Sequence, residues 1–527
     1  MHPNTRLSSR AWRVLRWAGL AAGAAALWAC TSRTLEAPTV VPVGETTQTI
    51  TQKVNNNLDL LFMVDNSTSM DPMQQKLLTQ LPNLMKALEG LPMKPNLHVA
   101  VVSSDMGAPS DTEIGCTPTG DQGKFQYQPQ PGCTATTITQ GDTYISDVDG
   151  VANFTDPIAN VFQCIALLGS AGCGFEHQLA SIDRALGADG NGPPPSTNTG
   201  FLRDDASLGI VMLTNEDDCS APTGTTIFSL NGGLENASNS DGPIQNYRCN
   251  GGHRGGHLCK DSNPGSQSTD LTTPPVLPPP DATGGTPAVQ LSDCEDNDSG
   301  SSALIPVSKF VEDIKQLKAD PDGQIFIGAI IAPASPYGVE WDPPMKFAQN
   351  PQPGELWPAI QHSCGPQNAT LPMTNPNATQ MPTDGSFGDP GVREFAFATA
   401  FHNSVVGSIC DPDYAESMTE IAHKLKVLLT PPCIIEKVQN DAQQNPDCSV
   451  TENLTDKQGG STHLAIPNCK ENGNVAPCWN MVPGDPTMGC SGQTIQVNDT
   501  AANMTANSEN TTVQCTICLP GVPGPGC

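Results

Sequence analysis

Short runs of consecutive apolar residues recur along the chain, and each is too brief for a helix. `LDLLFMV` at Leu58–Val64 shows the pattern, because it is apolar at nearly every position. Such runs are typical of strands buried on both faces of a parallel sheet. The predicted strands are 58–64, 97–105, 208–214, 323–333 and 404–409.

Between these runs, apolar residues recur at helical spacing. Leu77, Leu81, Leu84 and Leu88 are separated by steps of 4, 3 and 4, which places them on one face of a helix. The predicted helices are 71–90, a helix starting at 156–157, 175–186, 306–318, 392–401 and a last one starting at 411–412. Strands that alternate with helices predict an α/β sandwich with a mostly parallel sheet.

Long loop insertions interrupt this pattern at about 107–143, 222–300 and 334–388, the second of them rich in Gly, Pro and Asn. The first holds Cys116 and Cys133, which we expect to form a disulfide. Residues 433–527 are rich in cysteine and in turn residues, and have few apolar runs. They predict a separate disulfide-rich, β-rich C-terminal module after an α/β domain at 57–432.

The N-terminus has a basic stretch from Arg6 to Arg16, followed by a short apolar segment at 18–29. The next residues, `LWAC`, resemble a bacterial lipobox, which implies cleavage before Cys30 and lipidation of its thiol. Residues 30–56 would then be a tether. Thr31 is not the Asp that retains lipoproteins at the inner membrane, so the outer membrane is the expected location. The alternative is an ordinary secretory signal with a chance cysteine.

Cysteine content and charge agree with export. If Cys30 is lipidated, an even number of the 19 cysteines remains, as expected for disulfides in an exported chain. The formal net charge is −29, which disfavours nucleic acid and anionic surfaces. No later stretch is apolar for long enough to span a membrane. The lipid would therefore be the only membrane anchor.

Oxygen-bearing side chains follow the first predicted strand at alternate positions: Asp65, Ser67 and Ser69. Asp105 and the acidic group at 215–218 follow other strands. Because ligands of such sheets bind beyond the carboxyl ends of the strands, these side chains predict a cation site. The alternative is a helix N-cap, for which Ser69 or Asp71 is suited.

The segment `LLFMVDNSTSM` resembles the first motif of the von Willebrand factor A (vWA) domain, with its metal-ion-dependent adhesion site (MIDAS). The resemblance implies a Rossmann-like sandwich holding one Mg²⁺, or Mn²⁺ or Ca²⁺, whose coordination an acidic side chain of a partner protein completes. Where the family has its last aspartate, this chain has Asn215, and the family's middle threonine has no clear counterpart except Ser170 or, by spacing, Glu176. The metal ligands expected from the resemblance are Asp65, Ser67, Ser69, Asn215, Asp217 and Glu176. Asp105 and Glu216 are expected to contact these ligands without binding the metal themselves.

Two cysteine motifs suggest other chemistry. `CNGGHRGGHLC` offers Cys249, His253, His257 and Cys259 as a zinc set. The surrounding glycines and an oxidising compartment instead favour a Cys249–Cys259 disulfide with exposed histidines. `CTIC` at 515–518 has the spacing of a redox pair, but without a thioredoxin-like context its cysteines are expected in structural bridges.

The chain shows no nucleophile elbow, H-E-x-x-H or phosphate-binding loop. These absences do not exclude an enzyme, because catalytic triads are scattered in sequence. The hydroxyl-rich, partly neutral site leads us to expect a lipid-anchored, metal-dependent binding or adhesion protein of the bacterial cell envelope, not an enzyme. Two alternatives stay open: a secreted hydrolase with its active site in the insertions, and a structural envelope protein with a vestigial metal site.

Overall fold

The structure is a computed structural model that describes residues 47–518 with internal gaps. The gaps are 55, 90, 92–93, 109–115, 131–132, 134–137, 226, 229–245, 251–254, 262–288, 299, 301, 344–355, 366–373, 430–432, 456–460, 485–489 and 499–506. The predicted signal peptide, Cys30 and His253 lie outside the described residues. Within the described part of the chain, no helix is both long and apolar enough to cross a membrane.

A seven-stranded sheet in the order β12-β9-β6-β2-β3-β4-β5 forms the centre of the molecule. Neighbours from β12 to β3 pair in parallel, and β4 and β5 add antiparallel pairs at one edge. The strands are β2 (Asn57–Val64), β3 (Asn96–Ser103), β4 (Ile145–Val148), β5 (Val151–Ala152), β6 (Ser207–Leu213), β9 (Ile325–Ile331) and β12 (Asn403–Ser408). The predicted α/β class with a mostly parallel sheet is confirmed.

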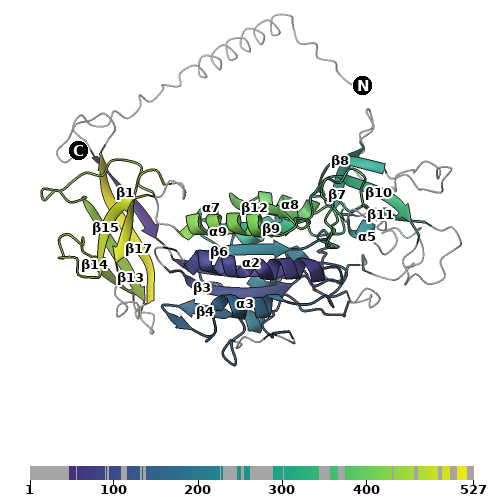
Figure 1. Ribbon diagram of the computed structural model, residues 1–527, viewed down its shortest axis with the longest axis horizontal. Coiled ribbons are helices and arrows are strands. Elements are labelled where there is room, and N and C mark those ends of the chain that lie inside the picture. The colour runs from purple at the N-terminus through teal and green to yellow at the C-terminus, as the bar shows by residue number, and fades with distance from the viewer. Residues whose placement is uncertain are drawn as a thin grey trace, which may run out of the picture.

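Helices cover both faces of this sheet (Figure 1). The helices are α2 (Asp71–Glu89), α3 (Ile158–Ala166), α4 (Gln178–Leu186), α5 (Asn246–Asn250), α6 (Val307–Lys315), α7 (Pro321–Gln324), α8 (Val392–Thr399) and α9 (Ala415–Leu429), with a 3-10 turn at Ser196–Asn198. Alternate residues of β2 face opposite layers. Phe62 packs in a core with α2, α3 and α9, whereas Met63 packs in a core with α4, α6 and α8. Burial on both faces explains why the strand sequence is apolar except at Asn57 and Asp59.

The strand order places a topological switch point between β2 and β6. Starting from β2, the chain first adds β3 and β4 on one side, and then returns to add β6, β9 and β12 on the other. Doubly wound sheets of this order bind ligands beyond the strand ends at that point. The residues that follow β2 and β6 are therefore the first place to look for a site.

The second and third insertions contain a four-stranded antiparallel sheet, here named the cap sheet, in the order β11-β10-β8-β7. Its strands are β7 (His257–Asp261), β8 (Val289–Asp296), β10 (Tyr337–Asp342) and β11 (Trp357–Ile360). The sequence predicts loops for these segments, and the cap sheet corrects that prediction. In Figure 1 it lies at the end of the central sheet opposite the C-terminal module.

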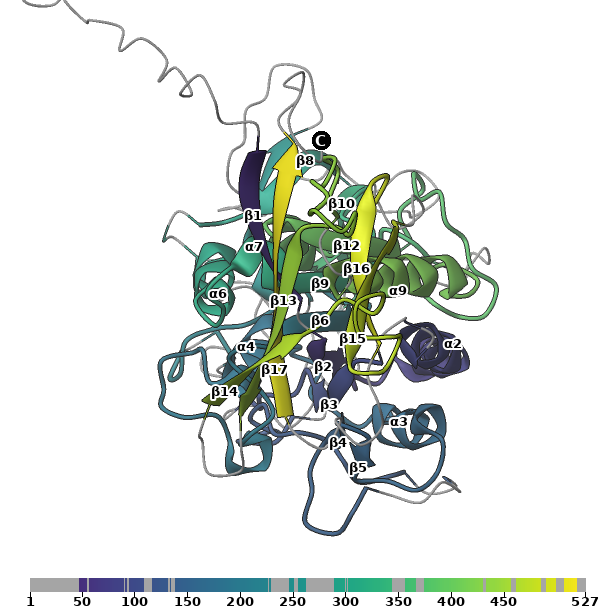
Figure 2. The same ribbon diagram turned by 90° about the vertical axis from the view of Figure 1, so that its left-hand side faces the viewer.

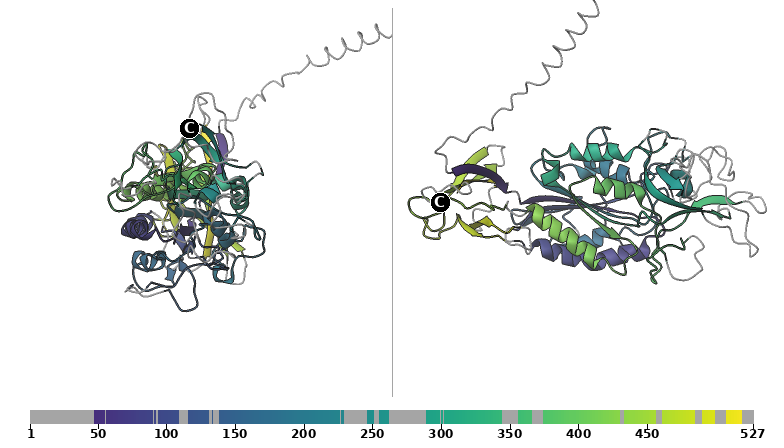
Figure 3. Two further views of the ribbon diagram at one scale, coloured as in Figure 1. Left: turned by 90° about the vertical axis from the view of Figure 1, so that its right-hand side faces the viewer. Right: turned by 90° about the horizontal axis from the view of Figure 1, so that it is seen from above.

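The C-terminal module is β-rich, as predicted, but the N-terminal strand completes it. β1 (Thr47–Val54) pairs over its whole length with β17 (Asn507–Cys518), and β17 pairs with β13 (Cys448–Thr455), which in turn pairs with β14 (Ser461–Ile466). β15 (Cys478–Pro483) and β16 (Gln493–Asn498) form a separate ribbon. Figure 2 shows the strands of this module end-on to the central sheet, and the right-hand view of Figure 3 shows β1 leading from the module toward that sheet. Residues 47–54 are therefore strand, where the sequence predicted tether.

Eight disulfides join cysteines of the described residues, and their pairing corrects the expected one. Cys116 bonds Cys173 and Cys133 bonds Cys164, in place of a Cys116–Cys133 bridge. Cys515 bonds Cys448, so it is a structural cysteine and not half of a redox pair. The remaining pairs are Cys219–Cys249, Cys259–Cys294, Cys364–Cys410, Cys433–Cys490 and Cys469–Cys478. Disulfides at this density indicate an extracytoplasmic protein.

Candidate functional site

Asp65 lies at the switch point, fully buried, directly after β2. Its Oδ1 accepts hydrogen bonds from the Ser67 backbone N–H at 2.8 Å and from Ser104 Oγ at 2.9 Å. Its Oδ2 accepts one from Thr214 Oγ1 at 2.8 Å. Burial raises the pKa of Asp65, and these hydrogen bonds act in the opposite direction. The carboxyl is thus fixed by β3 and β6 as well as by its own loop.

Three uncharged oxygens form a row beside Asp65. Ser67 Oγ lies 3.3 Å from Ser69 Oγ, and Ser69 Oγ donates to Asn215 Oδ1 at 2.9 Å. Neighbouring ligand oxygens of an octahedral Mg²⁺ ion stand roughly 3 Å apart, because its bonds are about 2.0–2.1 Å long. The buried Asn215 Nδ2 has no hydrogen-bond partner. The sequence-predicted Asp65, Ser67, Ser69 and Asn215 therefore come together, with spacing that suits a small divalent cation.

Glu176 and Glu216 are a pair of acids near this row. Burial raises the pKa of both carboxyls well above the ordinary value; each is raised further by the nearby Asp65 and Asp389, and Glu176 also by Glu216. Glu176 Oε1 is buried without a hydrogen-bond partner, whereas the residue Glu216 is partly exposed. A bound cation would offset the electrostatic repulsion among these carboxylates. The structure thus places the carboxyls of Glu176 and Glu216 close enough to Asp65 for their charges to interact.

Asp217 was expected among the ligands, but both oxygens of its carboxylate bond other residues. Its Oδ2 bonds His257 Nε2 of the cap sheet, and its Oδ1 accepts from the Arg393 backbone N–H at 2.9 Å. Burial acts to raise the pKa of Asp217, but His257, Glu394 and Arg393 together outweigh burial and the net shift is downward. Both oxygens already have strong partners, so we assign Asp217 a role in holding the loop rather than the metal.

Asp105 also differs from expectation. Its Oδ1 accepts from the Gly107 backbone N–H at 2.8 Å and so stabilises its own turn. The residue before it, Ser104, is the one that bonds Asp65. Successive residues of an extended segment point to opposite sides, so only one of the two neighbours can face the site.

The candidate zinc set does not assemble. Cys249 and Cys259 belong to separate disulfides. His257, expected to be exposed, is only 2% exposed and bonds Tyr337 Oη through Nδ1 at 2.7 Å. Among the described residues, no three His, Cys, Asp or Glu side chains form a group that could hold a metal ion. The oxygen row differs from such groups because its members, Ser67, Ser69 and Asn215, are all neutral.

Several residues of the site were not found from the sequence. Gln74 of α2 donates from Nε2 to the Asp65 carbonyl and to the Gly169 carbonyl, both at 2.8 Å. The Asp389 backbone N–H donates to the Asn215 carbonyl at 2.8 Å, and its side chain bonds His362. Thr214 and Ser104 end buried strands and could have been found by the strand-end rule. Gln74 and Asp389 carry no local sequence signal.

Comparisons with known proteins leave the family open. No protein-family description and no curated protein matches the chain. Solved structures with weak similarity include the pilus adhesin SpaC from Lactobacillus rhamnosus GG, at 10% identity and a TM-score of 0.26 over 89% of this chain and 41% of that one. The pilus adhesin RrgA from Streptococcus pneumoniae matches at 8% identity and a TM-score of 0.25, over 90% of this chain and 58% of that one. The chain thus spans less than two thirds of either adhesin, and at these scores the likeness transfers neither fold nor function.

Proposed function

We propose that this chain is a vWA-type binding protein of the bacterial cell envelope, using a metal-ion-dependent adhesion site at the β2/β6 switch point. The observation that carries the proposal is the oxygen row of Ser67, Ser69 and Asn215 beside the buried Asp65. The strand order of the central sheet supports it, because ligands of such sheets bind at this point.

The residues present fit one Mg²⁺ ion, with Mn²⁺ or Ca²⁺ as alternatives. Ser67, Ser69 and Asn215 would supply neutral oxygens, and Asp65 would supply the negative charge. Glu216 would compensate for the amide at Asn215, because its carboxyl lies close enough to Asp65 for the two charges to interact. Mostly neutral ligands leave a bound cation electron-poor, so it would accept a carboxylate from a partner protein.

The position of the site suits display away from an anchor. β1, the first described strand, lies in the C-terminal module, and the site lies at the far end of β2 beside the cap sheet (Figures 1 and 3). With Cys30 lipidated in the outer membrane, a partner would approach the end of the molecule opposite the lipid. The eight disulfides support location outside the cytoplasm.

The test is thermal unfolding of the metal-stripped chain 31–527, with Mg²⁺, Mn²⁺ or Ca²⁺ added. A cation at 100 times its Kd should raise the free energy of unfolding by about 2.7 kcal/mol if only the folded state binds it. Asp65→Ala and Ser67→Ala should lose the shift, and Asp204→Asn, which removes an exposed acid elsewhere, should keep it. Equal shifts in all variants would indicate diffuse binding to an acidic chain and would refute the site.

Partner binding needs a separate readout. Cells or envelope extracts can be screened with the immobilised chain in Mg²⁺ and in EDTA. Retention that requires Mg²⁺, and that an excess of acetate or glutarate reduces, would support capture of a carboxylate. Retention that EDTA leaves unchanged would contradict the proposed role even if the metal site exists.

A further inference from the structure

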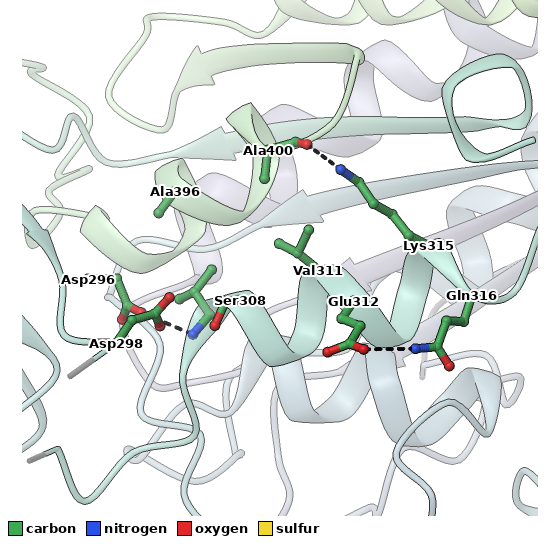
Figure 4. A pocket seen from close by; sticks show the side chains of 10 residues that line it. Asp296, Asp298, Ser308, Val311, Glu312, Lys315, Gln316, Ala396 and Ala400 are labelled. Atoms are coloured by element: carbon green, nitrogen blue, oxygen red, sulfur yellow. Dashed lines mark hydrogen bonds between the residues drawn. The ribbon is translucent and has the colours of Figure 1, made fainter. Parts of the chain in front are cut away.

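A groove of about 600 Å³ lies between α6 and α8, on the face of the sheet that these helices cover (Figure 4). Its walls are largely apolar, formed by Val307 and Val311 of α6 with Ala396 and Ala400 beside them. Acidic residues stand along it, with Asp298 near the start of α6 and Glu312 further along that helix. The groove therefore combines apolar walls with negative charge.

Asp296 and Asp298 both lie at the acidic end of the groove, but they differ in their exposure and in their hydrogen-bond partners. Asp296 is paired with Arg393 Nη1, and its Oδ2 accepts from the Val307 backbone N–H at 3.0 Å. Asp298 is exposed, and the small part of it that is buried acts to raise its pKa. Hydrogen bonds from Asp296 and Ser308 act in the opposite direction, and the net shift of the pKa is downward. Asp298 is thus ionised at neutral pH and has room for a further partner.

The other charged groups of the groove leave its negative charge unbalanced. Lys315 is the cation among the described lining residues; its Nζ donates to the Ala400 carbonyl at 2.8 Å and lies 5.2 Å from the Phe401 ring centre. Glu312 Oε1 accepts from Gln316 Nε2 at 3.2 Å, a neutral partner. Figure 4 shows Lys315 directed to Ala400 and away from Asp298.

We propose that this groove binds a lysine or arginine side chain presented by a partner protein. The aliphatic stem would lie on Val311, Ala396 and Ala400, and the charged end would reach Asp298. Long basic side chains have this amphipathic form, with an apolar stem and a charged tip. The chain carries 54 Asp and Glu against 25 Lys and Arg, so its field also favours a basic partner. The groove is separate from the metal site and needs no cation there.

The proposal can be tested with small probes that copy the side chain. Hexylguanidinium and hexylamine would be titrated by ligand-observed NMR into the metal-free chain 31–527, with hexanol as the uncharged control of matched length. We expect the cations to bind about fivefold more tightly than hexanol, the size of a favourable exposed ion pair. Asp298→Asn should remove this preference, and Ala400→Trp, at an exposed position, should fill the groove and abolish binding of all three probes.

Two control variants separate this site from its surroundings. Asp204→Asn removes an exposed acid outside the groove and should change nothing. Asp65→Ala should also leave the probe affinities unchanged, so failure of the metal site and failure of the groove are distinguishable. Equal affinities for hexanol and the cations would overturn the proposal, as would equal losses in Asp204→Asn and Asp298→Asn.

Discussion

Thr214 Oγ1 donates a hydrogen bond of 2.8 Å to Asp65 Oδ2, across 149 residues of sequence. The two residues follow β6 and β2, the strands that flank the switch point. Both are fully buried, and Gln178 Nε2 reaches the same hydroxyl at 2.9 Å. The site is thus fixed by contacts between its supporting strands and not by the Asp65 loop alone.

Replacing Thr214 by Val should therefore weaken both the fold and the proposed metal site. The substitution keeps the shape and removes the donor to a buried carboxyl, at a cost of about 1–3 kcal/mol in the free energy of unfolding. Thr214→Ser keeps the hydroxyl and is the matched control. Urea denaturation measures the stability, and the Mg²⁺-dependent shift in melting temperature measures the site. Identical behaviour of Val and Ser would show that the bond contributes nothing.

The buried Asp183 of α4 should make the folded chain less stable as pH rises. It is 4% exposed, and burial, with Asp313 and Asp189 nearby, raises its pKa to about 8. Because the folded pKa lies above the unfolded one, near 3.9, its contribution is fully present below pH 4 and is lost as pH rises to about 8. Asp183→Asn should thus stabilise the chain by ~1–3 kcal/mol at pH 8.5 and much less at pH 4.5. Urea unfolding at both pH values would show this, and a gain that is independent of pH would contradict it.

The His257–Asp217 pair joins the cap sheet to the loop that carries Asn215, and both side chains are fully buried. Removing one partner of a buried pair leaves the other uncompensated, so His257→Ala should cost about 3–5 kcal/mol. The double variant with Asp217→Asn should recover part of that loss. A double-mutant cycle on urea-unfolding data gives the coupling energy, and additive losses would mean that the pair does not interact.

The disulfide connectivity makes a prediction about covalent structure. Digestion of the non-reduced chain followed by mass spectrometry should yield peptides that link Cys116 to Cys173 and Cys133 to Cys164. The double variant Cys116→Ser/Cys173→Ser should lose about 4 kcal/mol, because the bridge closes a loop of 57 residues. A Cys116–Cys133 peptide would contradict this arrangement of the first insertion.

β1 covers the edge of β17, and its removal should expose that edge. Unpaired strand edges recruit further strands, so a chain starting at residue 57 should dimerise or form larger assemblies. A chain starting at residue 47 keeps β1 and is the matched control. Size-exclusion chromatography with light scattering distinguishes them, and a monomeric chain from residue 57 would show that β17 tolerates exposure.

The central sheet and its helices could be predicted because burial dictates their sequences. β2 is apolar on both faces, and Leu77, Leu81 and Leu84 of α2 all face one core. The same rule found most of the site, since Asp65 and Asn215 each end a buried strand. The strand β8 of the cap sheet was missed because it is mostly half-buried or exposed and its burial does not alternate, so it has no clear period. Disulfide partners and Asp389 depend on contacts made only in the folded chain, which residue spacing does not reveal.

The passage from β1 into β2 has a mechanical consequence. Two residues separate these strands, and Asp65 follows β2 directly, so an anchor at the N-terminus and a partner at the site would pull on opposite ends of one nearly continuous segment. β2 is held on both sides by parallel pairing with β3 and β6 in matching register. Tension along β2 would load these hydrogen bonds in shear, all together and not one after another. The strand that positions Asp65 is therefore also the one that would bear the force of the proposed attachment.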